Sequence, residues 1–242
     1  MRSIGKFLAL AAIATASIAY AVSAQPATAG EVESSIARGG LLYDKWYKVI
    51  GAEKPKAGHP AYPAGKKYAK KPDSWRCKEC HGWDYRGVNG AYKSGKHNSG
   101  IKGIDGMRGA DTAKIVAVLK DKTHALSGKM KDGDFQDLAM FVSKGQIDTS
   151  QYIDADFKVP IGGNAEFGAA VFNTTCARCH GVNGDQPKDM KKTLAKQMGN
   201  PWEVMHKIMN GHPGETMPAM RVFGPRVAAD VLTHVLTLPK EK

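Results

Sequence analysis

The clearest pattern of hydrophobic and polar positions lies in the last third of the chain. Small and apolar residues at helical spacing run from Gly168 to Phe172 and lead directly into Cys176. A second helical pattern covers residues 201–209, where proline stands in the first turn, and a third covers residues 226–236. The segments between them are rich in glycine, asparagine and proline, which favour turns. The pattern predicts an all-α domain of short helices joined by loops.

The first half of the chain repeats this plan with an addition. Residues 40–46 predict a first helix and residues 136–142 a last helix. Between them, residues 51–74 are rich in proline, glycine and lysine and predict an irregular surface loop inserted before Cys77. The three nearby aromatics Trp75, Trp83 and Tyr85 are expected to pack in the core around a cofactor.

The segment 145–163 reads as an extended connector between the two halves, with scattered aspartates and a Val-Pro-Ile-Gly-Gly run. We therefore expect an all-α protein with tandem domains at residues 25–150 and 151–242, which is ample length for two domains.

The N-terminus predicts an export signal. Arg2 and Lys6 precede an apolar stretch at residues 7–22, and small residues at positions 22–24 suit cleavage after Ala24, with Ala29 as a second choice. The signal peptide is thus expected at residues 1–24, and the mature protein in the periplasm without stable membrane insertion. An uncleaved membrane anchor is the alternative.

The motif Cys-X-X-Cys-His occurs twice, at residues 77–81 and 176–180, and uses all four cysteines. This is the attachment pattern of haem c, because a short turn sets two thiols against one porphyrin edge and delivers the adjacent imidazole to the iron. A redox disulfide or a zinc site would use the same cysteines, but neither explains a histidine after both pairs. The sequence predicts two covalently bound haem c groups, attached through Cys77, Cys80, Cys176 and Cys179, with His81 and His180 as iron ligands.

Residues 160–240 resemble the class I cytochrome c fold in the order of helix, haem motif, loop, helix, methionine loop and terminal helix. In that family, the methionine of a late Met-Pro pair binds the iron from the far side. Met217, which precedes a proline and lies 37 residues after His180, matches this position. Met220 is the alternative ligand, and His206 and His212 are expected on the surface.

Two residues are candidates for the far-side ligand of the first haem, His124 and Met130, and Met107 is a less favoured third. None of them precedes a proline, so the Met-Pro pair of the family does not decide between them. When the terminal helices are aligned, Asp230 lies 13 residues beyond Met217, and Asp137 lies 13 residues beyond His124. This register favours His124. A His/His haem has a lower reduction potential than a His/Met haem, so the pair would give a downhill internal electron step.

Positive charge is concentrated in the first domain. Residues 25–150 carry 22 lysines and arginines against 14 aspartates and glutamates, and residues 151–242 carry 11 against 9. Such a surface favours redox partner proteins with an acidic docking surface, although lysines also serve solubility alone. Nucleic-acid binding is not expected of an exported haem protein.

The two-domain layout resembles the dihaem proteins grouped with cytochrome c4. The resemblance implies a periplasmic carrier, with a dehydrogenase or quinol-oxidising complex as donor and a terminal oxidase or reductase as acceptor. The alternatives are the electron-transfer subunit of a larger oxidoreductase or an enzyme for a small anion, as in the thiosulfate dehydrogenases. In those enzymes a cysteine binds the catalytic iron, whereas here the haem attachments use every cysteine.

Overall fold

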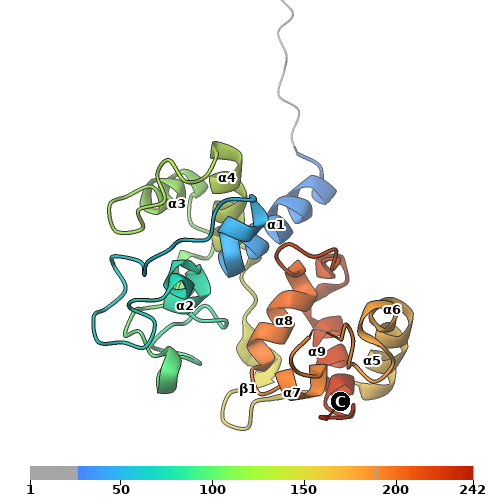
Figure 1. Cartoon of the computed structure of the whole chain (residues 1–242). Coiled ribbons are helices and arrows are strands. Elements are labelled where there is room, and N and C mark those ends of the chain that lie inside the picture. Colours follow the sequence, from blue (N-terminus) through green and yellow to red (C-terminus); the bar gives the residue numbers. More distant parts are fainter. Residues whose placement is uncertain (1–26, 189, 242) are drawn as a thin grey trace, which may run out of the picture.

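Two groups of helices lie side by side in the structure, a computed structural model that describes residues 27–188 and 190–241 (Figure 1). We call residues 27–150 the first half and residues 151–241 the second half. The all-α prediction is confirmed, because the only strands in these residues are two of two residues each. The expected signal peptide, residues 1–24, lies outside the described residues.

Four helices build the first half. They are α1 (Ala29–Val49), α2 (Cys77–His81), α3 (Thr112–Leu119) and α4 (Asp132–Met140), the last of which continues as a wider π-type turn at Phe141–Gly145. Thr28 starts α1 with a capping box, in which its side chain and that of Glu31 each accept from the other's backbone N–H. Residues 51–71 contain no helix or strand, as expected of the inserted loop.

The second half has five helices and a small hairpin. The helices are α5 (Ala165–Val171), α6 (Ala177–His180), α7 (Leu194–Gln197), α8 (Pro201–Asn210) and α9 (Gly224–Val235). The strands β1 (Ile153–Asp154) and β2 (Val159–Pro160) pair antiparallel within the expected connector. No helix in the described ranges offers a stretch both apolar and long enough to cross a bilayer.

The first and last helices of each half cross at a glycine. A Cβ on Gly39 of α1 would lie 2.0 Å from the carbonyl oxygen of Asp137 in α4. A Cβ on Gly168 of α5 would likewise lie 2.0 Å from the carbonyl oxygen of Asp230 in α9. Any larger residue would push the helices apart, so both crossings require glycine. The two aspartates are the pair that the sequence alignment superimposed.

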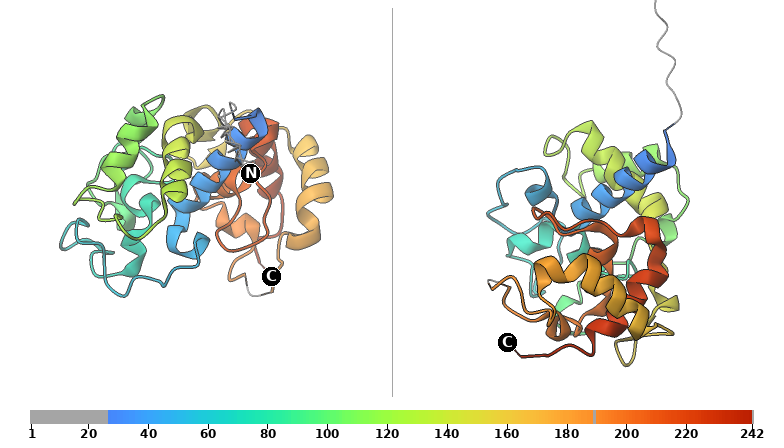
Figure 2. Two further views of the ribbon diagram at one scale, coloured as in Figure 1. Left: turned by 90° about the horizontal axis from the view of Figure 1, so that it is seen from above. Right: turned by 90° about the vertical axis from the view of Figure 1, so that its right-hand side faces the viewer.

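Helix α1 lies between the halves and packs against α8 (Figures 1 and 2). His206 of α8 is 1% exposed; its Nε2–H donates to the Gly40 carbonyl at 3.0 Å, and its Nδ1 accepts from the Tyr85 hydroxyl at 2.9 Å. Burial lowers the pKa of His206 to about 4, which keeps the ring neutral. The expectation that His206 lies on the surface is therefore wrong, because residues of the first half pack against α8 and cover this side chain.

Candidate haem sites

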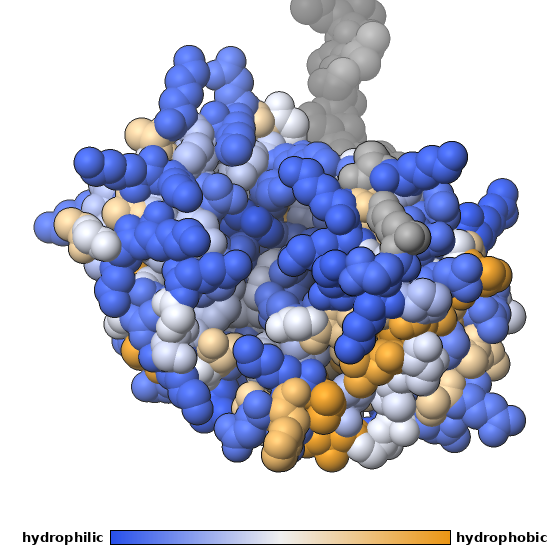
Figure 3. All heavy atoms as spheres, turned by 60° about the horizontal axis from the view of Figure 1, so that its bottom comes forward, coloured by the Kyte–Doolittle hydropathy of each residue, from blue (hydrophilic) through white to orange (hydrophobic). Residues whose placement is uncertain are grey.

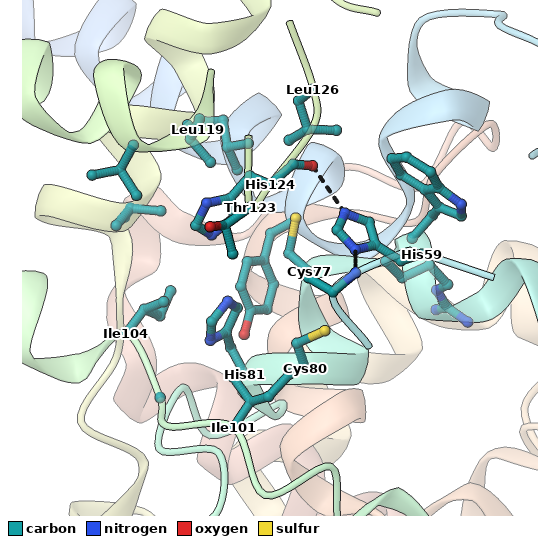
Figure 4. Close-up of a pocket in the computed structure, with 18 of the residues that line it drawn as sticks. His59, Cys77, Cys80, His81, Ile101, Ile104, Leu119, Thr123, His124 and Leu126 are labelled. Carbon is teal, nitrogen blue, oxygen red and sulfur yellow. Dashed lines mark hydrogen bonds between the residues drawn. The ribbon is translucent and has the colours of Figure 1, made fainter. Parts of the chain in front are cut away.

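The first half encloses a cavity of about 490 Å³ behind its Cys-X-X-Cys-His motif (Figure 4). Cys77, Cys80 and His81 line one side, and His124 lines the other. Apolar side chains complete the walls, including Ile104, Ile115, Leu119, Leu126, Leu138 and Val142. A largely apolar cavity with two thiols at its edge has the chemistry that a covalently attached haem requires.

His81 is held in the form that binds metals. Gly82, with φ of +82°, ends α2 directly after it. The Nδ1–H of His81 donates to the Lys102 carbonyl at 2.7 Å, which leaves Nε2 for the cavity. Burial lowers the pKa of His81 to about 4, so the imidazole is neutral and has a free lone pair.

His124 faces His81 across the cavity, with ring centroids 6.4 Å apart and ring planes inclined by 23° (Figure 4). Its Nδ1 lies 3.1 Å from the Asp121 carboxylate, which also accepts from the His124 backbone N–H at 2.8 Å. Because this carboxylate engages Nδ1, Nε2 is left for a metal, an arrangement common around metal-binding histidines. Two imidazoles that bind one ion from opposite sides at about 2.0–2.1 Å place their ring centroids roughly 6.4 Å apart, so the separation of these two rings would suit a haem iron between them.

The two methionines considered as ligands opposite His81 differ in their relation to the cavity. Met107 lines the cavity, whereas Met130 is buried in the core, at 9% exposure, and is not among the lining residues. Ala125, with φ of +52°, turns the chain directly after His124.

The inserted loop contributes a histidine that the sequence analysis missed. His59 lines the cavity, and its Nε2–H donates to the His124 carbonyl at 2.9 Å (Figure 4). Its Nδ1 accepts from the Ala61 N–H at 3.2 Å, and its ring meets the Trp75 ring edge-on at 4.3 Å. The loop thus anchors the segment that carries His124. No spacing or motif signals this role, because the contact joins residues 65 positions apart.

Burial affects the acidity of three of the four cysteines. Burial raises the pKa of Cys77 and of Cys80 to about 12, and that of Cys176 to about 11. None of the four forms a disulfide. In residues 27–188 and 190–241, no three His, Cys, Asp or Glu side chains are grouped so that they could hold a metal ion.

The second half presents the same proximal arrangement on α6. The Nδ1–H of His180 donates to the Gln186 carbonyl at 3.3 Å, the counterpart of the bond between His81 and Lys102. Cys179 is exposed, and Cys176 is half-buried. Met217 and Met220 both lie half-buried against the hydrophobic core, on the loop between α8 and α9.

Of the three aromatics expected around a cofactor, only Trp75 lines the cavity. Trp83 and Tyr85 are each 1% exposed and lie outside its lining, where the halves meet. Three cations surround the Trp83 ring at 5.2–5.9 Å from its centroid: Arg76, Lys78 and Lys207. Arg76 also pairs with the buried Asp44 and lines the cavity, so a charge network connects the Trp83 ring to the cavity wall.

Comparison with known families identifies a cytochrome c domain at residues 163–235. The matching model is described as cytochrome c oxidase, cbb3-type, subunit III, and the matched stretch contains α5, the second haem motif and Met217. A cytochrome c domain implies covalently bound haem c and points to haem-based electron transfer. No curated protein and no solved structure gives a significant match to the chain.

Proposed function

We propose that this protein is an exported dihaem c-type cytochrome that carries electrons, with a signal peptide at residues 1–24 and cytochrome c domains at 25–150 and 151–242. The observation that carries the proposal is the facing pair His81 and His124 in a cavity edged by Cys77 and Cys80. These residues lie in the half that the family model does not match, and they support a haem site there like the one that the model implies for residues 163–235.

In this proposal, the first haem is attached through Cys77 and Cys80 and ligated by His81 and His124. The second is attached through Cys176 and Cys179 and ligated by His180 and Met217. Each haem supplies an iron that changes reversibly by one electron. Burial holds the His81 imidazole in its neutral form, and apolar side chains line most of the first cavity. The two ligand sets would give the His/His site a lower potential than the His/Met site.

The proposed route starts at a dehydrogenase or quinol-oxidising complex and ends at a terminal oxidase or reductase in the periplasm. The excess of lysine and arginine in residues 25–150 supports a redox partner that docks through an acidic surface. An enzyme acting on a small anion at iron would need an open coordination position, and His124 opposite His81 argues against one in the first half.

The test combines haem counting with spectroscopy of the exported, haem-loaded protein. Mass spectrometry is expected to show two haems per chain. Low-temperature EPR and near-infrared MCD are expected to show one His/His and one His/Met low-spin haem. His124→Ala should disturb only the His/His signal, while Met130→Ala should leave both signals intact. A single haem, or a His/His signal lost in Met130→Ala alone, would contradict the proposal.

A further inference from the structure

A second cavity, of about 450 Å³, lies between the halves and shares no lining residue with the haem cavity. Its walls come from residues 91–97 of the first half, from Lys158 in the hairpin, and from residues 192–203 of the second half. Polar side chains dominate its lining, in contrast to the apolar haem cavity. We call this cavity the lysine groove. Hydrophilic side chains also cover most of the molecular face seen in Figure 3.

Positive charge in the lysine groove is not balanced by the protein. Lys96, Lys158, Lys192 and Lys196 line it, and Glu203 is its one lining carboxylate. Of these lysines, Lys196 pairs with Glu241 at 3.0 Å. Throughout the described chain, the ammonium groups of the other three have no hydrogen-bond or ion-pair partner.

Glu203 is already engaged and does not neutralise these lysines. One of its oxygens accepts from Lys207 at 3.2 Å, and the other accepts from the Asn200 amide at 3.1 Å. Ammonium groups gathered around a concave surface repel one another and attract anions more strongly than isolated surface lysines do. Ser94 offers a hydroxyl donor for oxygen atoms, and the amides of Gln197 and Asn200, each of which already donates once, have a second N–H.

We propose that the lysine groove binds a small polyanion with at least two negatively charged oxygens, of the phosphate or sulfur-oxyanion type. Its volume falls within the roughly 300–1,000 Å³ of small-ligand sites. Because both halves supply lysines, the bound anion bridges them and stabilises their contact. The groove also adjoins the first haem motif, since His97 in its wall lies 2.6 Å from Glu79, between Cys77 and Cys80.

Isothermal titration calorimetry of the haem-loaded protein with inorganic pyrophosphate tests the proposal, with thiosulfate and acetate as further probes. We expect one site per chain for pyrophosphate, an affinity that falls with ionic strength, and little binding of acetate. The variant Lys158→Gln/Lys192→Gln should bind about tenfold more weakly or worse. The control Lys114→Gln/Lys122→Gln removes two exposed lysines of the first half outside the groove, so the net charge changes equally.

Binding of pyrophosphate but not thiosulfate would assign the groove to phosphate-type anions, and the reverse would assign it to sulfur oxyanions. Equal weakening in the two double variants would show diffuse attraction to the basic surface and would overturn the site, as would the absence of binding. Neither result depends on the ligands of the irons, so the proposed electron-transfer function stands or fails separately.

Discussion

The two candidate haem sites differ in the contacts that hold the residue proposed to bind the iron opposite the motif histidine. In the first half, His124 is tied within its own half, by the Asp121 carboxylate and by His59 of the inserted loop. In the second half, the loop that carries Met217 is tied to the other half of the molecule.

Two side chains contribute to this second connection. Arg221, directly after the methionine loop, lies 3.2 Å from the Glu33 carboxylate of α1 and donates to the Gly145 carbonyl at 3.3 Å. Glu215, within the loop, pairs with Lys48 of α1 at 3.0 Å. The methionine loop of the matched region is therefore tied to residues outside that region as well as to its own half, for example through Arg221 and Asn210. In the unmatched half, the ties of His124 given above all lie within that half.

The largest effect is expected where the proposed iron ligand of the first half is exchanged. The variant His124→Met should raise the potential of the first haem by on the order of a few tenths of a volt, a share of the roughly 0.8 V that axial ligands control. The potential of the second haem should stay the same. Spectroelectrochemical titration measures both, with Met130→Leu as a control that changes a buried methionine outside the cavity. If the potential of the first haem did not change, His124 would not be a ligand of its iron.

A substitution at Arg221 tests whether the contact between the halves holds the methionine loop. The variant Arg221→Gln loses the contact with Glu33 and leaves buried acceptors short of a donor, so the free energy of unfolding should fall by about 1–3 kcal/mol. If Met217 is the ligand, the methionine-to-iron charge-transfer band should weaken, while the EPR signal of the first haem should not change.

The control for this variant is Arg226→Gln. Arg226 donates to the Ile161 and Gly162 carbonyls within its own half, so its loss should lower stability without weakening the methionine band. A band that weakens equally in both variants would mean that the loop is not held specifically through the contact between the halves.

A substitution at His59 tests the hydrogen bond between the inserted loop and the His124 carbonyl. The variant His59→Phe preserves a ring against Trp75 but removes the donor to the His124 carbonyl. Cyanide should then bind the first haem about 10–100-fold more tightly, because groups that orient metal ligands have effects of this size. His59→Gln keeps a donor and should restore much of the resistance to cyanide. An unaltered cyanide affinity in His59→Phe would show that the inserted loop does not position His124.

The sequence predicted most of what is periodic or local in this structure. Helical spacing gave the first and last helices of each half, and the proline- and glycine-rich composition gave the irregular loop at residues 51–71. The alignment of Asp137 with Asp230 also led to His124, which the structure brings opposite His81, although its ligation stays a prediction.

The contacts that sequence reasoning missed join distant segments through polar groups. His59, His206 and Arg221 each bond to a residue at least 65 positions away, and such pairings leave no period in the chain. His206 shows the reason most clearly, because its polarity alone predicts a surface position and only the packing of α1 against α8 buries it.

The smallest effect is expected at the exposed end of the methionine loop. Lys48 and Glu215 are 42% and 59% exposed, so their ion pair is screened by water and salt and is worth about 0–1 kcal/mol. The variant Lys48→Ala should therefore lower the free energy of unfolding only within that range in urea titrations, and the difference should shrink in high salt. Because Arg221 is only 10% exposed, its substitution should cost more than that of Lys48. If Lys48→Ala were the more damaging change, the loop would be held through its exposed tip, and the partly buried arginine would not be its principal tie to the first half.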